Sequence, residues 1–160
     1  MIAEFNIGRL LHDWEDPRVA PFVRALDRVY ALAEAAPGYV WHLPGEEMGR
    51  VQDDPDGPLK GDPRIACTLS VWESVEALAI FSLTGVHGAF VQRGPAWFEA
   101  WDTPRLVIWQ IADGTRPTVA EGVARLDRLT REGAGTHAFD WTYARQHGWL
   151  GAEDALAKPA

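Results

Sequence analysis

The sequence predicts one α+β domain in which helices pack on an antiparallel sheet. Three observations lead to this fold class. Short segments with alternating or β-branched apolar residues, typical of strands, are separated by longer segments with apolar residues at helical spacing. The chain has 160 residues, which is enough for one hydrophobic core. Finally, the predicted strands and helices take turns along the chain, with one long loop between the second and third strands.

The first strand is predicted over residues 3–10, where apolar and polar side chains alternate and Asn6 points to one face of the sheet. A helix follows, with Asp16 as its N-cap and a proline in its first position. Its apolar stripe continues at helical spacing until a Pro-Gly pair. A second alternating strand is predicted over residues 39–43.

Residues 44–63 are rich in turn-forming and acidic residues, and they predict a long solvated loop that acts as a lid. The third strand, residues 65–71, is β-branched and ends at Trp72. Ser74 is a predicted N-cap, so a helix follows the strand directly. This helix is expected to break near Gly85.

The fourth strand is predicted over residues 105–112, which are apolar on both faces. Thr118 and Glu121 have the spacing of a capping box, and the helix that they begin is predicted to end at Gly133. The tail from residue 134 is ambiguous, because its aromatic residues alternate as in an edge strand. The last eight residues are expected to be frayed.

This order of elements is that of a ferredoxin-like antiparallel sheet with helices on one face. We assign residues 1–133 to this domain and residues 134–160 to a C-terminal extension that packs on it. The strands at 65–71 and 105–112 carry apolar residues on both sides. A second copy of the sheet is therefore the predicted cover of the other face, which makes the protein a homodimer.

Composition excludes several classes of function. The formal net charge is -8, which disfavours nucleic acid and anionic membrane surfaces as partners. No apolar run approaches the roughly 20 residues that span a bilayer, and the N-terminal segment lacks signal-peptide features, so a cytoplasmic location is expected. Cys67 is the only cysteine and the histidines lack metal-ligand spacing, so no metal site is predicted.

The stretch VWESVEAL, followed by His87, resembles the dimeric α/β barrel superfamily, in which antibiotic-biosynthesis monooxygenase domains carry a similar turn and a later histidine. Nearly the whole chain, through EFNIGRL, VWESVEALAIF, PAWFEAW and RPTVAEGVARLDRL, is similar to the domain of unknown function 3291 family. The superfamily resemblance implies a pocket between sheet and helices for an aromatic or polyketide-like molecule, or for haem. The residues of haem-degrading members would correspond to Asn6, Trp72 and His87.

His87 and Asn6 are the predicted catalytic residues. Histidine titrates near neutral pH, so His87 is expected to act as a general base. The Asn6 amide is expected to steady a developing oxyanion. The alternatives remain that His87 caps a helix end or satisfies a polar group in the core, and that Asn6 bonds to a neighbouring loop.

Eight tryptophans and six phenylalanines are many for a chain of this length. They predict either a dense core or an aromatic-lined pocket for an apolar ligand. The predicted substrate-binding residues are Trp41, Trp72, Phe90, Trp97, Trp101 and Trp109.

The sequence therefore predicts a homodimeric α/β barrel protein that binds a small apolar or aromatic molecule. If it is an enzyme, it is expected to be a cofactor-independent monooxygenase, isomerase or cyclase. Two alternatives stay open: a haem-binding or haem-degrading protein, and a carrier without catalytic activity. Apart from haem in the first alternative, no cofactor is expected.

Overall fold

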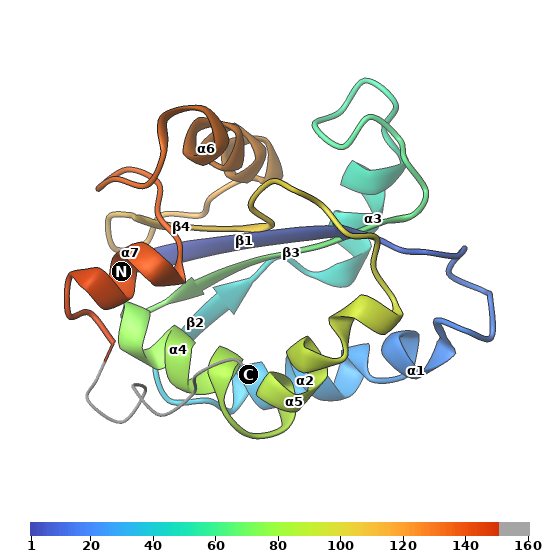
Figure 1. The fold of residues 1–160 in the computed structure, drawn as a ribbon, viewed down its shortest axis with the longest axis horizontal. Helices are drawn as coiled ribbons and strands as arrows, with labels where there is room; N and C mark the ends of the chain where they lie inside the picture. The colour runs from blue at the N-terminus through green and yellow to red at the C-terminus, as the bar shows by residue number, and fades with distance from the viewer. Residues whose placement is uncertain (151–160) are drawn as a thin grey trace.

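The computed structural model describes residues 1–150, apart from the side-chain surroundings of residues 85 and 86, and shows an α+β fold (Figure 1). Its four-stranded sheet is antiparallel throughout and has the order β2-β3-β1-β4. The strands are β1 (Ile2–Arg9), β2 (Tyr39–His42), β3 (Ile65–Trp72) and β4 (Leu106–Gln110). The helices are α1 (Ala20–Val23), α2 (Leu26–Glu34), α3 (Gly45–Asp53), α4 (Val75–Leu83), α5 (Gly85–Gln92), α6 (Val119–Glu132) and α7 (Trp141–Gln146), with a short 3-10 turn at Gly94–Ala96.

Strand β1 lies in the middle of the sheet, between β3 and β4. Its pairing with β3 puts Glu4 opposite Ser70 and Asn6 opposite Thr68. Because side chains alternate along a strand, these four polar residues share one face of the two central strands. The predicted alternation of β1 is thus confirmed, and the pairing brings polar residues from distant segments together.

Helices cover both faces of the sheet, so the expectation of helices on one face is wrong. Phe5, Val107 and Leu129 belong to one core cluster, which joins β1 and β4 to α6. Trp72 and Leu78 belong to the cluster on the opposite face, together with residues of α2 and α7. Figure 1 shows the sheet between α6 on one side and α2 and α5 on the other.

The close approach of α6 to the sheet depends on a glycine. A Cβ atom on Gly122 would lie 2.6 Å from Cγ of Phe5, which is closer than such atoms ever approach. Gly122 therefore lets the helix lie directly over β1. Of the two strands from which we predicted a second copy of the sheet, β4 is covered on this face by α6 of the same chain.

The predicted first helix is divided into α1 and α2. Asp16 bonds to Arg18 instead of capping a helix, and α1 begins only at Ala20. Pro21 cannot donate a backbone hydrogen bond, so a helix that began at Pro17 would lose one there. The first α2 bond is donated by the amide of Val29, after a break at residues 24–25.

We predicted a solvated loop over residues 44–63, and this prediction is wrong. These residues contain α3, and Met48 and Leu59 are each 6% exposed within the core. Helix α3 is amphipathic, and Met48 is its buried residue. Met48 belongs to the same core cluster as residues of β3. The many turn residues concealed this short helix.

The N-caps predicted at Ser74 and Thr118 are confirmed. Oγ of Ser74 accepts the backbone N–H of Ala77 at 3.1 Å, and Oγ1 of Thr118 accepts that of Glu121 at 3.1 Å. Gly133, with a φ of 80°, ends α6.

The tail does not form the edge strand that its alternation suggested. Phe139 makes one antiparallel bridge with Ile108, and α7 then begins after Asp140, which caps it. Residues 134–150 pack against the same core as α4. The rest of the predicted extension, including the predicted frayed end, lies outside the described residues.

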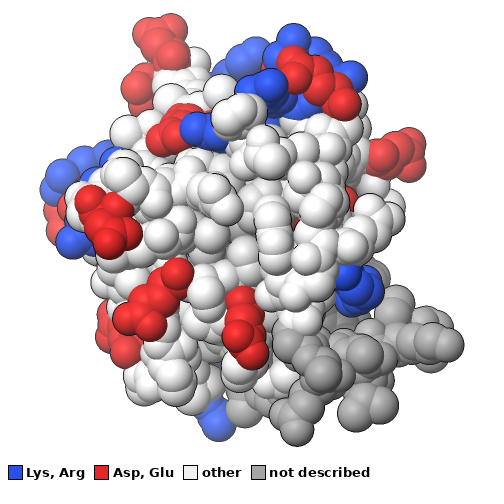
Figure 2. All heavy atoms as spheres, turned by 90° about the vertical axis from the view of Figure 1, so that its left-hand side faces the viewer, with Lys and Arg blue, Asp and Glu red and all other residues white. Residues whose placement is uncertain are grey.

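No helix within residues 1–150 is both long and apolar enough to cross a membrane. On the face shown in Figure 2, acidic and basic side chains lie in small scattered groups and form no continuous patch.

Candidate functional site

A cavity of about 550 Å³ lies between the sheet and the helices beneath it. It brings together Asn6 from β1, His87 and Phe90 from α5, and Trp97 from the segment after α5. These four predicted site residues come from parts of the chain up to 91 positions apart in the sequence. A volume of this size is typical of small-molecule sites in proteins.

The four polar residues of the two central strands form a group that we call the polar floor: Glu4, Asn6, Thr68 and Ser70. Glu4, Asn6 and Thr68 line the cavity, and Ser70 lies next to Glu4 outside the lining. The Asn6 amide nitrogen donates to Oε1 of Glu4 and to Oγ1 of Thr68, both at 2.7 Å. Both N–H groups of this amide are therefore used, and its oxygen is the atom left for a ligand. Asn6 thus offers a ligand an acceptor, and this arrangement does not suit the predicted oxyanion role.

The Trp72 indole and the Glu4 carboxyl group are both hydrogen-bonded to the Ser70 hydroxyl. Nε1 of Trp72 donates to Oγ of Ser70 at 3.0 Å, and an indole N–H can only donate. With Glu4 ionised, the Ser70 hydroxyl gives its own hydrogen to Oε2 of Glu4, at 2.9 Å. Each carboxyl oxygen of Glu4 thus accepts one hydrogen bond from the protein.

Glu4 is the unusual group of this floor, because its side chain is only 4% exposed. Burial removes water from the carboxylate and raises its pKa to about 7, although the hydrogen bonds from Asn6 and Ser70 oppose the rise. No ion pair to Glu4 occurs within residues 1–150. A carboxyl group with so high a pKa, next to a cavity, is typical of functional sites.

His87 lies in the first turn of α5, just after the predicted helix break, which occurs at Thr84. Its Nδ1 lies 3.2 Å from the carbonyl oxygen of Ser82, so Nδ1 carries the hydrogen and Nε2 is the basic nitrogen. The ring stacks on Phe81 with centroids 4.6 Å apart. Burial lowers the pKa of His87, which favours the neutral base at neutral pH.

An aromatic wall lines another part of the cavity. Phe90 and Trp97 have ring centroids 4.9 Å apart, and Phe22 lies 5.9 Å from Trp97 and 5.1 Å from Phe98. Trp14 extends this group, with its centroid 5.9 Å from that of Phe22. All five rings line the cavity.

Four of the predicted substrate-binding tryptophans lie outside the lining of the cavity: Trp41, Trp72, Trp101 and Trp109. Trp109 is fully buried on the α6 face, and Trp41 and Trp101 pack against the same core. Trp72 lies behind the cavity, where it stacks on Phe81 at 5.1 Å and orients Ser70. It therefore contacts partners of both His87 and Glu4 without lining the cavity itself.

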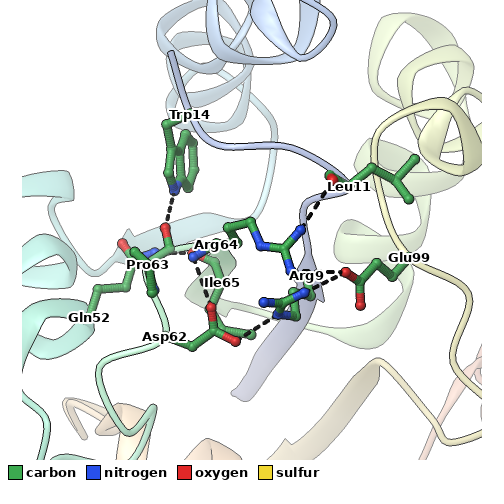
Figure 3. A network of polar contacts seen from close by, with 9 residues as sticks. All are labelled: Arg9, Leu11, Trp14, Gln52, Asp62, Pro63, Arg64, Ile65 and Glu99. Atoms are coloured by element: carbon green, nitrogen blue, oxygen red, sulfur yellow. Dashed lines mark hydrogen bonds and ion pairs between the residues drawn. The ribbon is translucent and has the colours of Figure 1, made fainter. Parts of the chain in front are cut away.

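A polar network joins the end of β1 to the loops beside the cavity (Figure 3). The Arg9 guanidinium lies between Asp62, at 2.7 Å, and Glu99. Nearby, Nε1 of Trp14 donates to the carbonyl oxygen of Pro63 at 2.8 Å, which holds this ring of the aromatic wall in place. The network ties residues 62–64 to the segment that carries Trp97.

Sequence reasoning missed Glu4. The alternation of β1 placed Glu4 on the same face as Asn6, and Thr68 and Ser70 have the same two-residue spacing on β3. These two polar pairs on otherwise apolar strands were the signal in the sequence that could have indicated Glu4 as a site residue. Their meaning depended on the strand register, which periodicity does not provide.

Within residues 1–150, no group of three or more His, Cys, Asp or Glu side chains could hold a metal ion. Burial raises the pKa of the Cys67 thiol to about 12, so this thiol stays protonated at neutral pH.

A family model, described as Domain of unknown function (DUF3291), matches residues 1–150. The chain belongs to this family. The match confirms the resemblance to the domain of unknown function 3291 family that was seen in the sequence. The matched residues include the whole sheet, the lining of the cavity and α7. Comparisons with curated proteins and with solved structures gave no match.

Proposed function

We propose that this protein binds a small, mainly apolar molecule in the cavity and acts on it by proton transfer without a cofactor. The observation that carries the proposal is the convergence of His87, the polar floor and the aromatic wall on one cavity of about 550 Å³. Apolar walls with a few polar groups are typical of sites that bind and orient such molecules.

His87 is the proposed general base. Its Nδ1–H bond to Ser82 leaves the Nε2 lone pair for a proton of the ligand. In the step we propose, a C–H or O–H bond of the ligand breaks, Nε2 takes the proton, and the electron pair stays on the ligand. Isomerases and cyclases can begin in this way, and a cofactor-independent monooxygenase would use dioxygen as the next reactant.

Binding can be tested with 2-indanol, a neutral bicyclic probe, by isothermal titration calorimetry. Ala66 lines the cavity from β3, so Ala66→Leu should weaken binding by filling space. Val91→Trp is a second such variant, at an exposed position of the lining. Ala31→Phe adds a ring at an exposed α2 position outside the lining and should leave the affinity unchanged. Equal affinities in all four proteins would contradict the proposed site.

Proton transfer can be tested with 2-indanone in D2O, by following the loss of its C–H signals adjacent to the carbonyl by NMR. The wild type should accelerate the exchange, and His87→Gln should reduce the rate to that of buffer. Binding without accelerated exchange in the wild type would contradict catalysis on this class of ketone and favour the carrier.

Haem binding is a second proposal, and it is favoured by one observation. A histidine whose Nδ1 donates to a backbone carbonyl presents Nε2, which is the usual arrangement of a metal-binding imidazole. His87 would then be the residue that holds the haem, and the haem would supply oxidative chemistry. A Soret band that forms with added haemin and is lost in His87→Ala supports this function; an unchanged haemin spectrum contradicts it.

We also propose that the fold is ferredoxin-like, which the antiparallel strand order β2-β3-β1-β4 supports. The dimeric α/β barrel remains a proposal for the assembly. Because α6 covers the sheet face at β1 and β4, a partner sheet could face only what α6 leaves open. Light scattering after size-exclusion chromatography tests this proposal, which predicts twice the mass of 17.7 kDa.

A further inference from the structure

The polar floor presents acceptors to the cavity, and we infer that the ligand is a small organic amine bound as its ammonium ion. This inference rests on the proposed function, because it specifies the ligand of the same cavity. It concerns Glu4, a residue that the proposed proton transfer to His87 does not use.

The first step is the hydrogen bonding of the floor. With Glu4 ionised, its oxygens only accept, so the atom of Asn6 that faces Glu4 must be the amide nitrogen. The Asn6 oxygen accepts no bond within residues 1–150, and each Glu4 oxygen accepts only one there. The complement of these oxygens is a ligand group that donates several hydrogen bonds.

The second step is charge. A buried carboxylate without a cationic partner is costly, and Glu4 forms no ion pair in the described part of the chain. Arg105 also lines the cavity, but its guanidinium donates to the Glu99 carbonyl oxygen and lies 5.7 Å from the Trp101 ring centre. A ligand ammonium would supply the missing positive charge, which a neutral hydroxyl would not.

The third step is the shape and chemistry of the surroundings. The aromatic wall offers ring faces and edges to the apolar body of a ligand, and ring faces also attract cations. Glu4, Asn6 and Thr68 of the floor line the same cavity as the wall. A ligand with an ammonium group on an aromatic or aliphatic ring system complements both surfaces: its ammonium group complements the polar floor, and its rings complement the aromatic wall.

The test compares three probes that share one bicyclic skeleton: 2-aminoindane, 2-indanol and indane-2-carboxylate. At pH 8, calorimetry on the wild type should show 2-aminoindane binding at least about 10-fold more tightly than 2-indanol, with the carboxylate weakest. In Glu4→Gln, which keeps the shape but removes the charge, the preference for the amine should disappear while 2-indanol still binds. Ala31→Phe, which lies outside the lining, serves as the control and should keep the preference for the amine.

The outcomes separate the two proposals. If 2-indanol binds and loses affinity in Ala66→Leu, the proposed binding site is supported. If 2-aminoindane then binds no better than 2-indanol, the inference that the ligand is an amine is overturned. If the preference for the amine persists in Glu4→Gln, Glu4 is not its partner and the inference is overturned. If none of the three probes binds, both proposals are contradicted.

Discussion

The amide nitrogen of Asn6 lies 2.7 Å from Oε1 of Glu4, two residues earlier on the same central strand. This contact changes the expected chemistry of both residues. Both N–H groups of the Asn6 amide donate to protein atoms. Glu4 is a buried carboxyl group that hydrogen bonds hold in one orientation beside the cavity. The site is therefore built around an acidic residue, which the sequence alone did not single out.

Glu4→Gln should stabilise the free protein at pH 8 and have little effect at pH 4. Because burial raises the pKa of Glu4 from 4.5 to about 7, the folded state holds a proton that the unfolded state releases. The stability contributed by this proton is fully present below pH 4.5 and is lost as the pH rises through about 7. At pH 8 the variant should gain roughly 3 kcal/mol in free energy of unfolding, measured by urea denaturation. An equal effect at both pH values would contradict the raised pKa.

His87 should be neutral at pH 7, with its hydrogen on Nδ1. Desolvation lowers its pKa, and the Ser82 carbonyl oxygen accepts from Nδ1. Long-range 1H–15N NMR correlation spectra of the imidazole distinguish the two tautomers directly. A ring that carries its hydrogen on Nε2, or a pKa above the ordinary histidine value, would rule out the proposed orientation of the base. His87→Gln identifies the resonance by its disappearance.

Trp97 and Trp109 should differ in their effect on ligand binding. Both are buried, so Trp97→Leu and Trp109→Leu should each cost about 2–4 kcal/mol in free energy of unfolding. Only Trp97 lines the cavity. The affinity for 2-indanol should therefore fall in Trp97→Leu and stay near the wild-type value in Trp109→Leu, under conditions where both variants remain folded. The reverse order would place the binding site on the α6 face.

Gly122→Ala should destabilise the protein although alanine favours helices. The added Cβ would meet the Phe5 side chain at 2.6 Å, and the forced movement should cost about 1–3 kcal/mol in free energy of unfolding. Gly49→Ala is the matched control, because a Cβ there meets nothing within 4 Å in α3. This control should be neutral or gain up to about 1 kcal/mol. Equal effects of both changes in thermal denaturation would mean that α6 does not lie on β1.

The sequence determined the local elements of this protein. Alternation predicted β1, and the spacing of Ser74 and Thr118 from their apolar stripes predicted where α4 and α6 begin. These features depend on contacts within a few residues, which periodicity and capping preferences report directly. The same reasoning placed Asn6 and His87 in one site, with the help of a family resemblance.

Only the tertiary structure decided what those elements meet. The register between β1 and β3 joined Glu4 to Ser70, and the packing of α6 covered β1 and β4 on a face for which we had predicted a second copy as cover. It also placed Trp97 in the cavity and Trp109 in the opposite core. A strand pattern shows which side chains share a face, but the pairing of distant segments determines whether that face meets a cavity, a helix or water.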